Sequence, residues 1–489
     1  MAYVITQNCC NDASCLAACP IGCIHPRPDE PDFATAEMLY IDPQACIDCG
    51  ACADACPVGA IKAGDALAER DLPFVEVNAA FYRRVPQQPD YRPRLVREHD
   101  TVENRRIRVA IVGAGPAAWY AADDLLRRVP GAVVDMIDRR IVPWGLLRAG
   151  VAPDHHATKG VADRWRQPDD VAARLRLHLG VEVGVHVSHG ELEAGHDAVV
   201  YATGAARPRT LDIAGEHLAG VVSGVALAGW FNGDIGVPGP AAGALRQKRA
   251  VVVGNGNVAL DAARLLLTPP ERLVATDMGP EALAALHGSL IREVVVLGRR
   301  GPEHAAFTLP ELIGLTQVDG VDVDVEGPVD REASSDPVVR ARLDLLADLA
   351  ERTAQRAAGR GPAAERRVVL RFGAAPERIL GATVVEGVRL ADGTDLEAGL
   401  VVVSAGTLPT AVPGLPVDAV GRTPHEGGRV RPGLYLAGWA KRRSPRPAAS
   451  RMRPASWRPP WSRSIGCPRL TGPDRWAPVR RSWKRDRGR

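Results

Sequence analysis

The chain has 489 residues, too many for one ordinary hydrophobic core, so we expect about three domains. Hydrophobic residues make up 46% of the chain and aromatic residues only 4%, a balance typical of an α/β protein. No stretch approaches the roughly 20 apolar residues of a membrane helix, and the first residues lack the basic and apolar regions of a signal peptide. We therefore expect a cytoplasmic protein without membrane insertion. The formal net charge of +3 conceals an imbalance, because residues 441–489 carry +14 and residues 1–72 carry −8.

Nine of the ten cysteines lie before residue 57, and seven of them form two matching runs. The second run reads Cys46-x-x-Cys49-x-x-Cys52-x-x-x-Cys56-Pro57, the spacing with which bacterial ferredoxins bind cubane iron–sulfur clusters. The first run has Cys9, Cys15 and Cys19-Pro20, with Asp12 in place of its second cysteine. The sequence therefore predicts an α+β ferredoxin-like domain over residues 1–72, suited to a reducing compartment. A disulfide scaffold or paired zinc ribbons are the alternatives.

In this pattern the fourth cysteine of each run binds the cluster of the other run. We therefore predict a [4Fe-4S] cluster on Cys46, Cys49, Cys52 and Cys19. The other site has Cys9, Cys15 and Cys56, and Asp12 stands where a fourth thiolate belongs. A [3Fe-4S] cluster is expected there, or a second [4Fe-4S] cluster with a labile iron bound by the carboxylate. Cys10 and Cys23 lie outside both sets, and we expect Cys23 to pack near a cluster rather than to bind it.

Prolines interrupt residues 73–105 around a short apolar piece, which predicts a packed arm followed by a linker. A regular α/β alternation begins after this segment. Short β-branched runs predict buried parallel strands at 108–112, 133–137, 198–202, 250–253, 294–297 and 400–403. Stretches rich in Ala and Arg predict helices at 115–128, 257–267 and 337–358. Two strand–glycine turn–helix units stand out within this alternation.

The first unit passes from a strand through Gly113-Ala-Gly115-Pro116-Ala117 into a helix. Glycines at these positions allow a tight turn and let pyrophosphate oxygens approach the backbone N–H groups at the helix start. The next strand ends in Asp138, which is placed to accept a hydrogen bond from a ribose hydroxyl. Strand, turn, helix and acid together predict a dinucleotide site.

The second unit carries Gly254-Asn255-Gly256-Asn257-Val258 at its turn. The strand that follows this unit is succeeded not by an acid but by Arg299 and Arg300. Two guanidiniums at this place suit a 2′-phosphate, which favours NADPH over NADH. The alternative is a solvated pair of arginines at the end of a strand.

The segment Ile141-Val-Pro-Trp-Gly145-Leu-Leu-Arg-Ala-Gly-Val-Ala-Pro-Asp-His155 resembles the NADPH:adrenodoxin/ferredoxin reductase family, as do Gly254–Asp261, Gly298–Pro302 and Leu436–Arg442. Together with the cysteine runs, the chain resembles the actinobacterial branch that carries a fused seven-iron ferredoxin. The resemblance implies two Rossmann-like dinucleotide-binding domains after the ferredoxin-like one. The NADP domain, 208–375, is inserted between two parts of the FAD domain, 106–207 and 376–442.

The resemblance also implies site residues. FAD belongs to the first unit, with Gly145, Leu146, Gly438 and Trp439 completing its site, and NADPH belongs to the second. His155 and Glu311 match the family's polar pair beside the flavin, which organises polar contacts and proton handling there, and they are our candidate catalytic residues. From the residues alone, an ordinary buried histidine explains His155 equally well.

The implied activity is that of a ferredoxin–NADP(+) reductase. NADPH delivers two electrons as a hydride, and FAD passes them singly to iron–sulfur clusters. A ferredoxin or a cytochrome P450-type acceptor is the implied partner, and no nucleic acid. A glutamate-synthase small-subunit-like electron donor is one alternative. A non-enzymatic iron–sulfur carrier with a vestigial, FAD-deficient reductase half is another.

The resemblance stops abruptly after Arg442, inside a cofactor motif. Residues 443–489 are rich in Arg, Pro and Trp and show no hydrophobic periodicity. We expect this segment to be the product of a frameshift in a GC-rich gene, and a disordered basic tail is the alternative. The family continues here with a turn into a helix that faces the flavin, so its loss predicts weak FAD binding or none.

Overall fold

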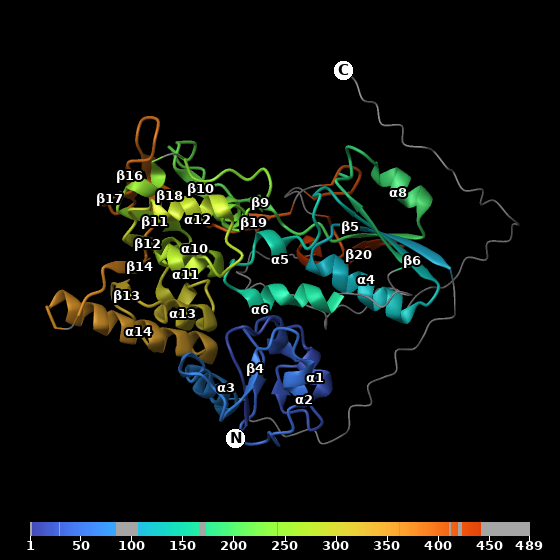
Figure 1. Ribbon diagram of the computed structural model, residues 1–489, viewed down its shortest axis with the longest axis horizontal. Helices are drawn as coiled ribbons and strands as arrows, with labels where there is room; N and C mark the ends of the chain where they lie inside the picture. Colours follow the sequence, from blue (N-terminus) through green and yellow to red (C-terminus); the bar gives the residue numbers. More distant parts are fainter. Residues whose placement is uncertain are drawn as a thin grey trace, which may run out of the picture. The chain divides into compact units, whose positions relative to one another are not determined.

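The computed structural model describes residues 2–28, 30–84, 106–165, 173–241, 243–360, 362–409, 412–418 and 423–441 (Figure 1). The segment 443–489, which we predict to arise from a frameshift, lies outside these residues, as do residues 85–105 of the predicted linker. Over the described part of the chain, no helix has both the length and the apolar character needed to cross a bilayer.

The N-terminal module consists of two short β-ladders and two single-turn helices. Strand β1 (Tyr3–Ile5) pairs antiparallel with β4 (Ile61–Ala63), and β2 (Ile24–His25) pairs with β3 (Tyr40–Ile41). Helices α1 (Ser14–Ala18) and α2 (Ala51–Ala55) each begin one residue before the third position of a cysteine run and end before its fourth. The module therefore repeats one loop-and-helix unit. The 3-10 turns η1 (Pro31–Ala34) and η2 (Glu69–Asp71) complete it.

The predicted arm begins with helix α3 (Pro73–Arg84), which packs on this module. The buried carboxamide of Asn78 accepts hydrogen bonds from the N–H groups of Ile5 (3.3 Å) and Ile41 (2.9 Å). It also donates to the carbonyl of Ile5 (2.8 Å). One side chain thus satisfies backbone groups of two strands, because buried polar groups need such partners. Helix α3 is consequently an integral part of the module's packing.

The first large sheet has the strand order β20-β21-β8-β5-β6-β7, and all its neighbours are parallel except the pair β20–β21. Its strands are β5 (Ile107–Val112), β6 (Ala132–Asp138), β7 (Leu175–Leu179), β8 (Ala198–Tyr201), β20 (Arg429–Arg431) and β21 (Leu434–Leu436). Helix α4 (Pro116–Arg128) connects β5 to β6 (Figure 1). The other helical segments of this part are α5 (Leu146–Ala149), α6 (His156–Lys159), η3 (Gly160–Trp165), α8 (His189–Gly195) and η6 (Gly438–Lys441).

The second large sheet is wholly parallel, in the order β10-β18-β11-β12-β14-β13. Its strands are β10 (Val221–Ser223), β11 (Arg249–Val253), β12 (Glu293–Gly298), β13 (Val321–Glu326), β14 (Arg366–Phe372) and β18 (Leu400–Val403). Its helical segments are α9 (Gly224–Phe231), η4 (Ala244–Arg246), α10 (Asn257–Leu267), α11 (Pro270–Leu273), α12 (Pro280–His287), η5 (Pro302–His304), α13 (Leu309–Thr316) and α14 (Pro337–Ala357).

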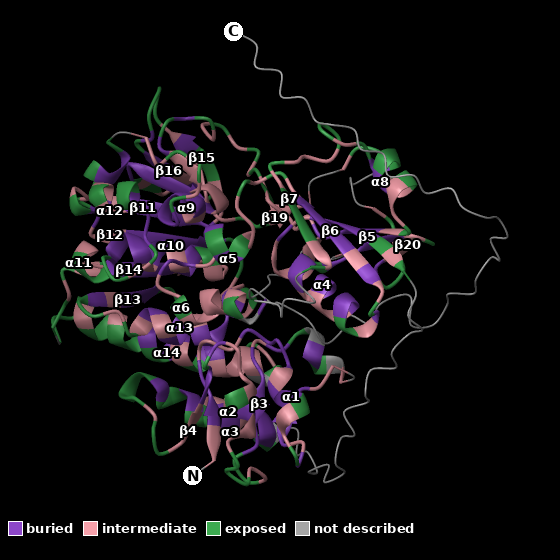
Figure 2. Cartoon of the chain, turned by 45° about the vertical axis from the view of Figure 1, so that its right-hand side comes forward, coloured by how far each residue is buried: buried purple, intermediate pink, exposed green. Residues whose placement is uncertain are grey.

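Both faces of this second sheet are buried, as the purple strands of Figure 2 show. Alternate residues of one strand enter opposite cores, because side chains in a strand alternate between faces. Val252 packs in the core on the helical face, and its neighbour Val251 packs in the core under a small antiparallel sheet. That small sheet consists of β15 (Pro376–Leu380), β16 (Gly387–Leu390) and β17 (Asp395–Glu397). This two-sided burial explains the continuous Val-rich runs, and all six predicted strands and three predicted helices are present.

The chain returns to the first sheet later than the predicted residue 376. Strand β18 lies inside the second sheet, between β10 and β11, and β15–β17 cover that sheet's face. The apolar run Leu-Val-Val-Val of β18 needs burial on both faces, and the second sheet supplies it, with helices on one face and β15–β17 on the other. The chain leaves the first sheet through β9 (Arg207–Pro208) and returns through β19 (Thr407–Leu408), and these two strands pair with each other.

Candidate functional site

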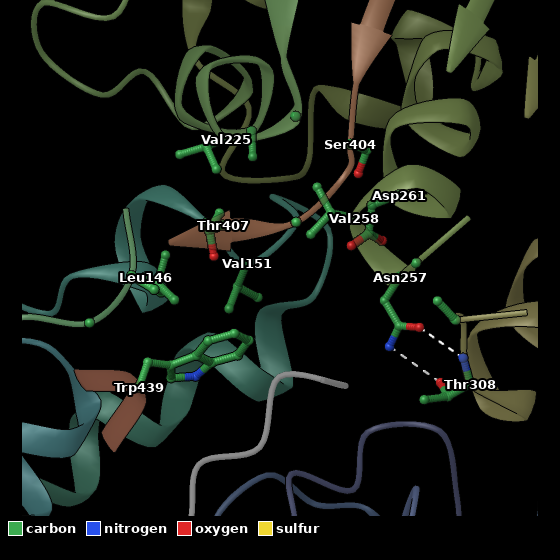
Figure 3. Close-up of a pocket in the computed structure, with 18 of the residues that line it drawn as sticks. Leu146, Val151, Val225, Asn257, Val258, Asp261, Thr308, Ser404, Thr407 and Trp439 are labelled. Atoms are coloured by element: carbon green, nitrogen blue, oxygen red, sulfur yellow. Dashed lines mark hydrogen bonds between the residues drawn. The ribbon is translucent and has the colours of Figure 1, made fainter. Parts of the chain in front are cut away.

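One large cavity, about 2560 Å³ in volume, is lined by both glycine turns, by loops that follow β8 and β18, and by residues of the N-terminal module. Figure 3 shows Leu146 and Trp439 on one side of this space and Val258, Asp261 and Ser404 on the other. The walls therefore come from segments that are hundreds of residues apart in the sequence.

The first glycine turn connects β5 to α4, and at Gly113 it leaves no room for a side chain. Gly113 has a φ of +106°, and a Cβ there would lie 2.6 Å from the carbonyl oxygen of Ala202 at the end of β8. Gly115 caps helix α4, and Pro116 occupies the first helical position, where its missing N–H costs nothing. The start of this 13-residue helix lines the cavity. Its remaining free backbone N–H groups form a ready anion site.

Four further predicted residues gather around this turn. A Cβ at Gly145 would lie 2.9 Å from the Cα of Gly115, and a Cβ at Gly438 would lie 2.5 Å from the Cβ of Ala117. The loop before α5 and the returning segment η6 therefore both press against the start of helix α4. Leu146 and Trp439 line the cavity beside them.

Asp138 stands at the end of β6 and joins the first turn to the loop that follows it. One carboxylate oxygen accepts a hydrogen bond from the N–H of Ala114 (2.6 Å), and the other accepts from the N–H of Arg140 (2.8 Å). The carboxylate also lines the cavity. Asp138 thus stands at the end of the second strand beside the glycine turn, and its role in ribose binding stays a prediction.

The second glycine turn repeats this construction between β11 and α10. Gly254 has a φ of +112°, and a Cβ there would lie 2.3 Å from the carbonyl oxygen of Ser404 after β18. Gly256 caps helix α10, and a Cβ at Gly256 would meet nothing within 4 Å. The turn therefore has free space at Gly256, where a ligand's pyrophosphate would lie. It has none at Gly254, which packs against the chain that follows β18.

Asparagines and arginines border the second turn. The side chain of Asn257 accepts from the N–H of Thr308 (2.8 Å) and donates to its hydroxyl (3.3 Å), as the dashed lines in Figure 3 show. The carboxamide of Asn255 lies close against Gly298 at the end of β12. Arg299 and Arg300 follow that glycine, line the cavity and are exposed. This is the place predicted for recognition of a 2′-phosphate.

The two candidate catalytic residues come together from different elements. His155 precedes α6, Glu311 lies in the first turn of α13, and Asp261 of α10 joins them, with one ligand-type atom from each within 4.8 Å of the others. Arg264 holds the group together. Its guanidinium pairs with Asp154, donates to Asp261 (2.6 Å) and lies 3.1 Å from Nε2 of His155.

Burial shapes the electrostatics of this group. It raises the pKa of Glu311 to about 7, with the charge of Asp261 acting in the same direction and His155 and Arg264 opposing it. Although burial also acts on Asp154, the positive charge of Arg264 lowers the pKa of that carboxyl. Near neutral pH, Glu311 therefore exchanges a proton easily, while Asp154 stays ionised.

Three members of this group were not predicted from the sequence: Asp154, Asp261 and Arg264. Asp154 is next to His155 in the segment that resembles the reductases, and Asp261 closes the second glycine motif, so both had a local signal. Arg264 had only its spacing of three residues from Asp261 on one helix face. Its contact with Asp154 joins residues 110 positions apart and depends on the tertiary structure.

The two cysteine runs adopt the same backbone conformation at an offset of 37 residues. Asn11 and Asp48 both have a φ of +57°, and Ala13 and Gly50 have φ values of +65° and +77°. The fourth cysteines are also equivalent: Cys19 Sγ accepts from the N–H of Cys23 (3.4 Å), and Cys56 Sγ accepts from the N–H of Ala60 (3.3 Å). The loop around Asp12 therefore has the same backbone fold as the loop of the second run, although one thiolate is absent from its sequence.

The structure brings the predicted ligands into two groups. Cys19 lines one small pocket together with Cys46, Cys49 and Cys52. Cys9, Cys15, Cys56 and Asp12 interact electrostatically at the other site. Cys23 packs at the first group, with its Sγ 3.5 Å from that of Cys19, and Cys10 is buried beside Cys9 and Asp12. Burial raises the pKa of the Cys9 thiol to about 11, so binding of iron there must displace a proton.

Asp12 directs its carboxylate to the start of helix α1. One oxygen accepts from the N–H of Ser14 (3.2 Å), and the other lies 2.5 Å from the Ser14 hydroxyl. The side chain is 8% exposed, so these bonds compensate its burial. An oxygen donor in this place fits a site that is short of one thiolate ligand.

The chain matches known families over most of its length. The family of pyridine nucleotide-disulphide oxidoreductases matches residues 107–438, and the 4Fe-4S binding domain matches residues 39–62. The probable ferredoxin/ferredoxin–NADP reductase of Mycobacterium leprae is 45% identical, a match that covers 90% of this chain and 82% of that one. The mitochondrial NADPH:adrenodoxin oxidoreductase of Bos taurus is 37% identical, with coverages of 71% and 76%.

A solved structure agrees with these matches. FprA of Mycobacterium tuberculosis in complex with NADPH is 38% identical, with a TM-score of 0.62, and the likeness covers 69% of this chain and 79% of that one. The predicted α/β fold with an N-terminal ferredoxin-like domain is confirmed. The chain belongs to the ferredoxin–NADP reductase family, in the branch with a fused iron–sulfur domain.

Proposed function

We propose that this chain is a ferredoxin–NADP(+) reductase, which passes electrons from NADPH through FAD to iron–sulfur clusters one at a time. One observation carries the proposal: both dinucleotide turns and Cys9 of the N-terminal module line the same cavity. A two-electron donor and a one-electron acceptor can therefore meet in one cavity. FAD, when bound, supplies the exchange between two-electron and one-electron chemistry. This family assignment also favours the reductase over the glutamate-synthase-like alternative.

The first unit is assigned to FAD. Gly113, Gly115, Pro116 and Ala117 form the cradle, whose helix N–H groups suit a pyrophosphate. Asp138 is assigned to the ribose, and Gly145, Leu146, Gly438 and Trp439 to the wall beside the flavin. In terms of domains, the FAD part comprises residues 106–207 and the chain after β19, with the NADP part between them.

The second unit is assigned to NADPH. Gly254, Asn255, Gly256, Asn257 and Val258 form its turn, and the exposed Arg299 and Arg300 are assigned to the 2′-phosphate. Over the described part of the chain, their guanidiniums have no ion-pair or hydrogen-bond partner, so they can make the paired, charge-assisted hydrogen bonds of phosphate recognition.

His155 and Glu311 are assigned to proton handling beside the flavin site. Arg264 orients His155 at Nε2, and Glu311 has its pKa raised to about 7, so it gains and loses a proton near neutral pH. The reaction needs no strong acid or base. The role of this pair is to exchange the proton that accompanies hydride transfer with solvent.

The Asp12 site is assigned to a [3Fe-4S] cluster, or to a [4Fe-4S] cluster with a labile iron, next to the [4Fe-4S] cluster of the second run. Asp12→Cys supplies the missing thiolate in a loop that already has the backbone conformation of the second cysteine run. We expect the variant to bind about one more iron per chain than the parent. Iron analysis and electron paramagnetic resonance (EPR) of the oxidised protein check this, since the three-iron signal must disappear. An unchanged signal would contradict the assignment.

A ferredoxin or a cytochrome P450-type protein is assigned as the external acceptor. The charge of −8 on the N-terminal module suits docking on a basic reductase face. Clusters of this kind persist in a reducing compartment, so we assign the protein to the cytoplasm.

The function is tested with the whole chain, purified anaerobically with excess FAD, because the sequence after Arg442 predicts weak FAD binding. NADPH should bleach the flavin and cluster absorbances, and NADH should do so poorly. Replacing Arg299 and Arg300 by alanine should raise the KM for NADPH about ten- to hundredfold and leave the KM for NADH unchanged. Iron without flavin, and no reduction by NADPH, would contradict the proposal and favour the carrier-only alternative.

A further inference from the structure

Glu37 of the N-terminal module reaches into the second Rossmann-like part. Its carboxylate accepts a hydrogen bond from the backbone N–H of Leu309 (2.7 Å) and another from Nη1 of Arg342 (3.0 Å). The Glu37 side chain is 11% exposed and that of Arg342 is 6% exposed, so this ion pair is largely shielded from water. A shielded charge pair with further hydrogen bonds is expensive to break.

The partners of Glu37 are themselves well fixed. Leu309 is the first residue of α13, whose free N–H groups and dipole favour a carboxylate at this end. Arg342 of α14 also donates to the carbonyl of Phe307 (3.0 Å), and its guanidinium lies 5.9 Å from the centre of that ring. The Glu37 side chain thus caps helix α13 and forms an ion pair with Arg342 of helix α14.

Other contacts support the same placement. Gln317 Nε2 donates to the carbonyl of Arg70 (2.8 Å), and helix α3 contacts helix α14. Gln7 lies so close to Gly314 of α13 that a Cβ at Gly314 would be 2.2 Å from its Nε2. The module is therefore held at α13 and α14 by polar contacts at several points, with Glu37 as the only charged one of those described.

This placement distinguishes the two cysteine groups. Cys9 and Cys10 line the large cavity together with the dinucleotide turns. The pocket of Cys19, Cys46, Cys49 and Cys52 is separate, and Cys49 is exposed beside Ile47, which is 59% exposed. The first site thus faces the flavin cavity, and the second faces the surface.

We propose that Glu37 is a positioning residue that docks the module on α13 and α14, so that the site of Cys9, Asp12, Cys15 and Cys56 receives electrons from the flavin first. The surface-facing site then delivers them to the external acceptor. This inference rests on the proposed function. For each NADPH oxidised to NADP+, two clusters take up one electron each, and one proton is released to solvent.

The test uses the FAD-loaded whole chain and the variant Glu37→Gln, with Glu76→Gln as the matched control. Glu76 lies on α3 of the same module, is 71% exposed and pairs only with Arg83 among the described residues. In Glu37→Gln we expect faster deuterium uptake at the start of α13 and cluster reduction by NADPH slowed about tenfold or more. Reduction of ferricyanide, taken directly from the flavin, should stay unchanged, as should iron content. The control should match the parent in every measurement.

The outcomes are separable. If NADPH reduces neither flavin nor clusters in the parent chain, the proposed function fails. If the parent is active but Glu37→Gln shows parental deuterium uptake or parental cluster reduction, the inference is overturned.

A second measurement tests the order of the sites. With Cys46→Ala, which removes a ligand of the surface-facing site, NADPH should still reduce the first cluster at the parental rate, as followed by EPR. If NADPH no longer reduces the first cluster while dithionite still does, the proposed order of electron transfer between the two sites is wrong.

Discussion

Replacing Gly254 by alanine is expected to abolish measurable NADPH binding and to lower the free energy of unfolding by about 2–5 kcal/mol. Gly254 has a φ of +112°, which an alanine adopts only with strain, and a Cβ would lie 2.3 Å from the Ser404 carbonyl oxygen. Relief by movement is blocked, because the Ser404 N–H is bonded to the carbonyl of Val253 (2.8 Å). Urea unfolding and NADPH titration measure the two effects.

Gly256→Ala is the matched comparison within the same turn. Gly256 has an ordinary φ of −92°, and a Cβ there would meet nothing within 4 Å, so we expect a stability change within about 0.5 kcal/mol. NADPH binding should nevertheless weaken, since the added methyl group occupies the space at the start of α10 where the pyrophosphate would lie. Equal losses of unfolding free energy in the two variants would contradict the view that the clash with Ser404 causes the loss in Gly254→Ala.

Arg264→Gln is expected to destabilise the folded chain by about 3–5 kcal/mol. The guanidinium is 11% exposed and is the charge partner of Asp154 and Asp261, so its loss leaves partly buried carboxylates facing one another. The pKa of Glu311, already raised to about 7, should rise further, because Arg264 opposes the shift. Denaturant unfolding at several pH values measures the change.

The sign of the pH dependence follows from Glu311. Its pKa is higher in the folded chain than its ordinary value of 4.5, so folding takes up a proton between these two values. The stability contribution of this group is therefore intact below pH 4.5 and is lost as the pH rises to about 7. The deficit of Arg264→Gln should be largest above pH 7, and Asp261→Asn should restore part of it.

Arg272→Gln provides the control for this variant. Arg272 also forms an ion pair, with Asp319, but the two side chains are 56% and 73% exposed. Solvent screens such pairs, so we expect a change of no more than about 1 kcal/mol. Similar losses for the two arginines would contradict the view that burial of the Arg264 group causes the effect.

Much of the architecture was determined by local sequence. The Val-rich runs and the helices between them follow from side-chain periodicity, and both glycine turns lie where a strand passes directly into a helix. Cysteine spacing alone grouped Cys19 with Cys46, Cys49 and Cys52, because the loop conformation of this motif fixes which thiolates can converge.

Only the tertiary structure decided how these units meet. The assignment of β18 to the second sheet depends on which neighbours bury both of its faces, and its apolar run would suit the centre of either sheet. The contacts of Arg264 with Asp154 and of Glu37 with Arg342 join residues 110 and 305 positions apart, and no periodic signal marks such pairs. Local propensity acts over a few residues, whereas the sharing of one cavity by two nucleotide turns and a cysteine loop results from packing across the whole chain.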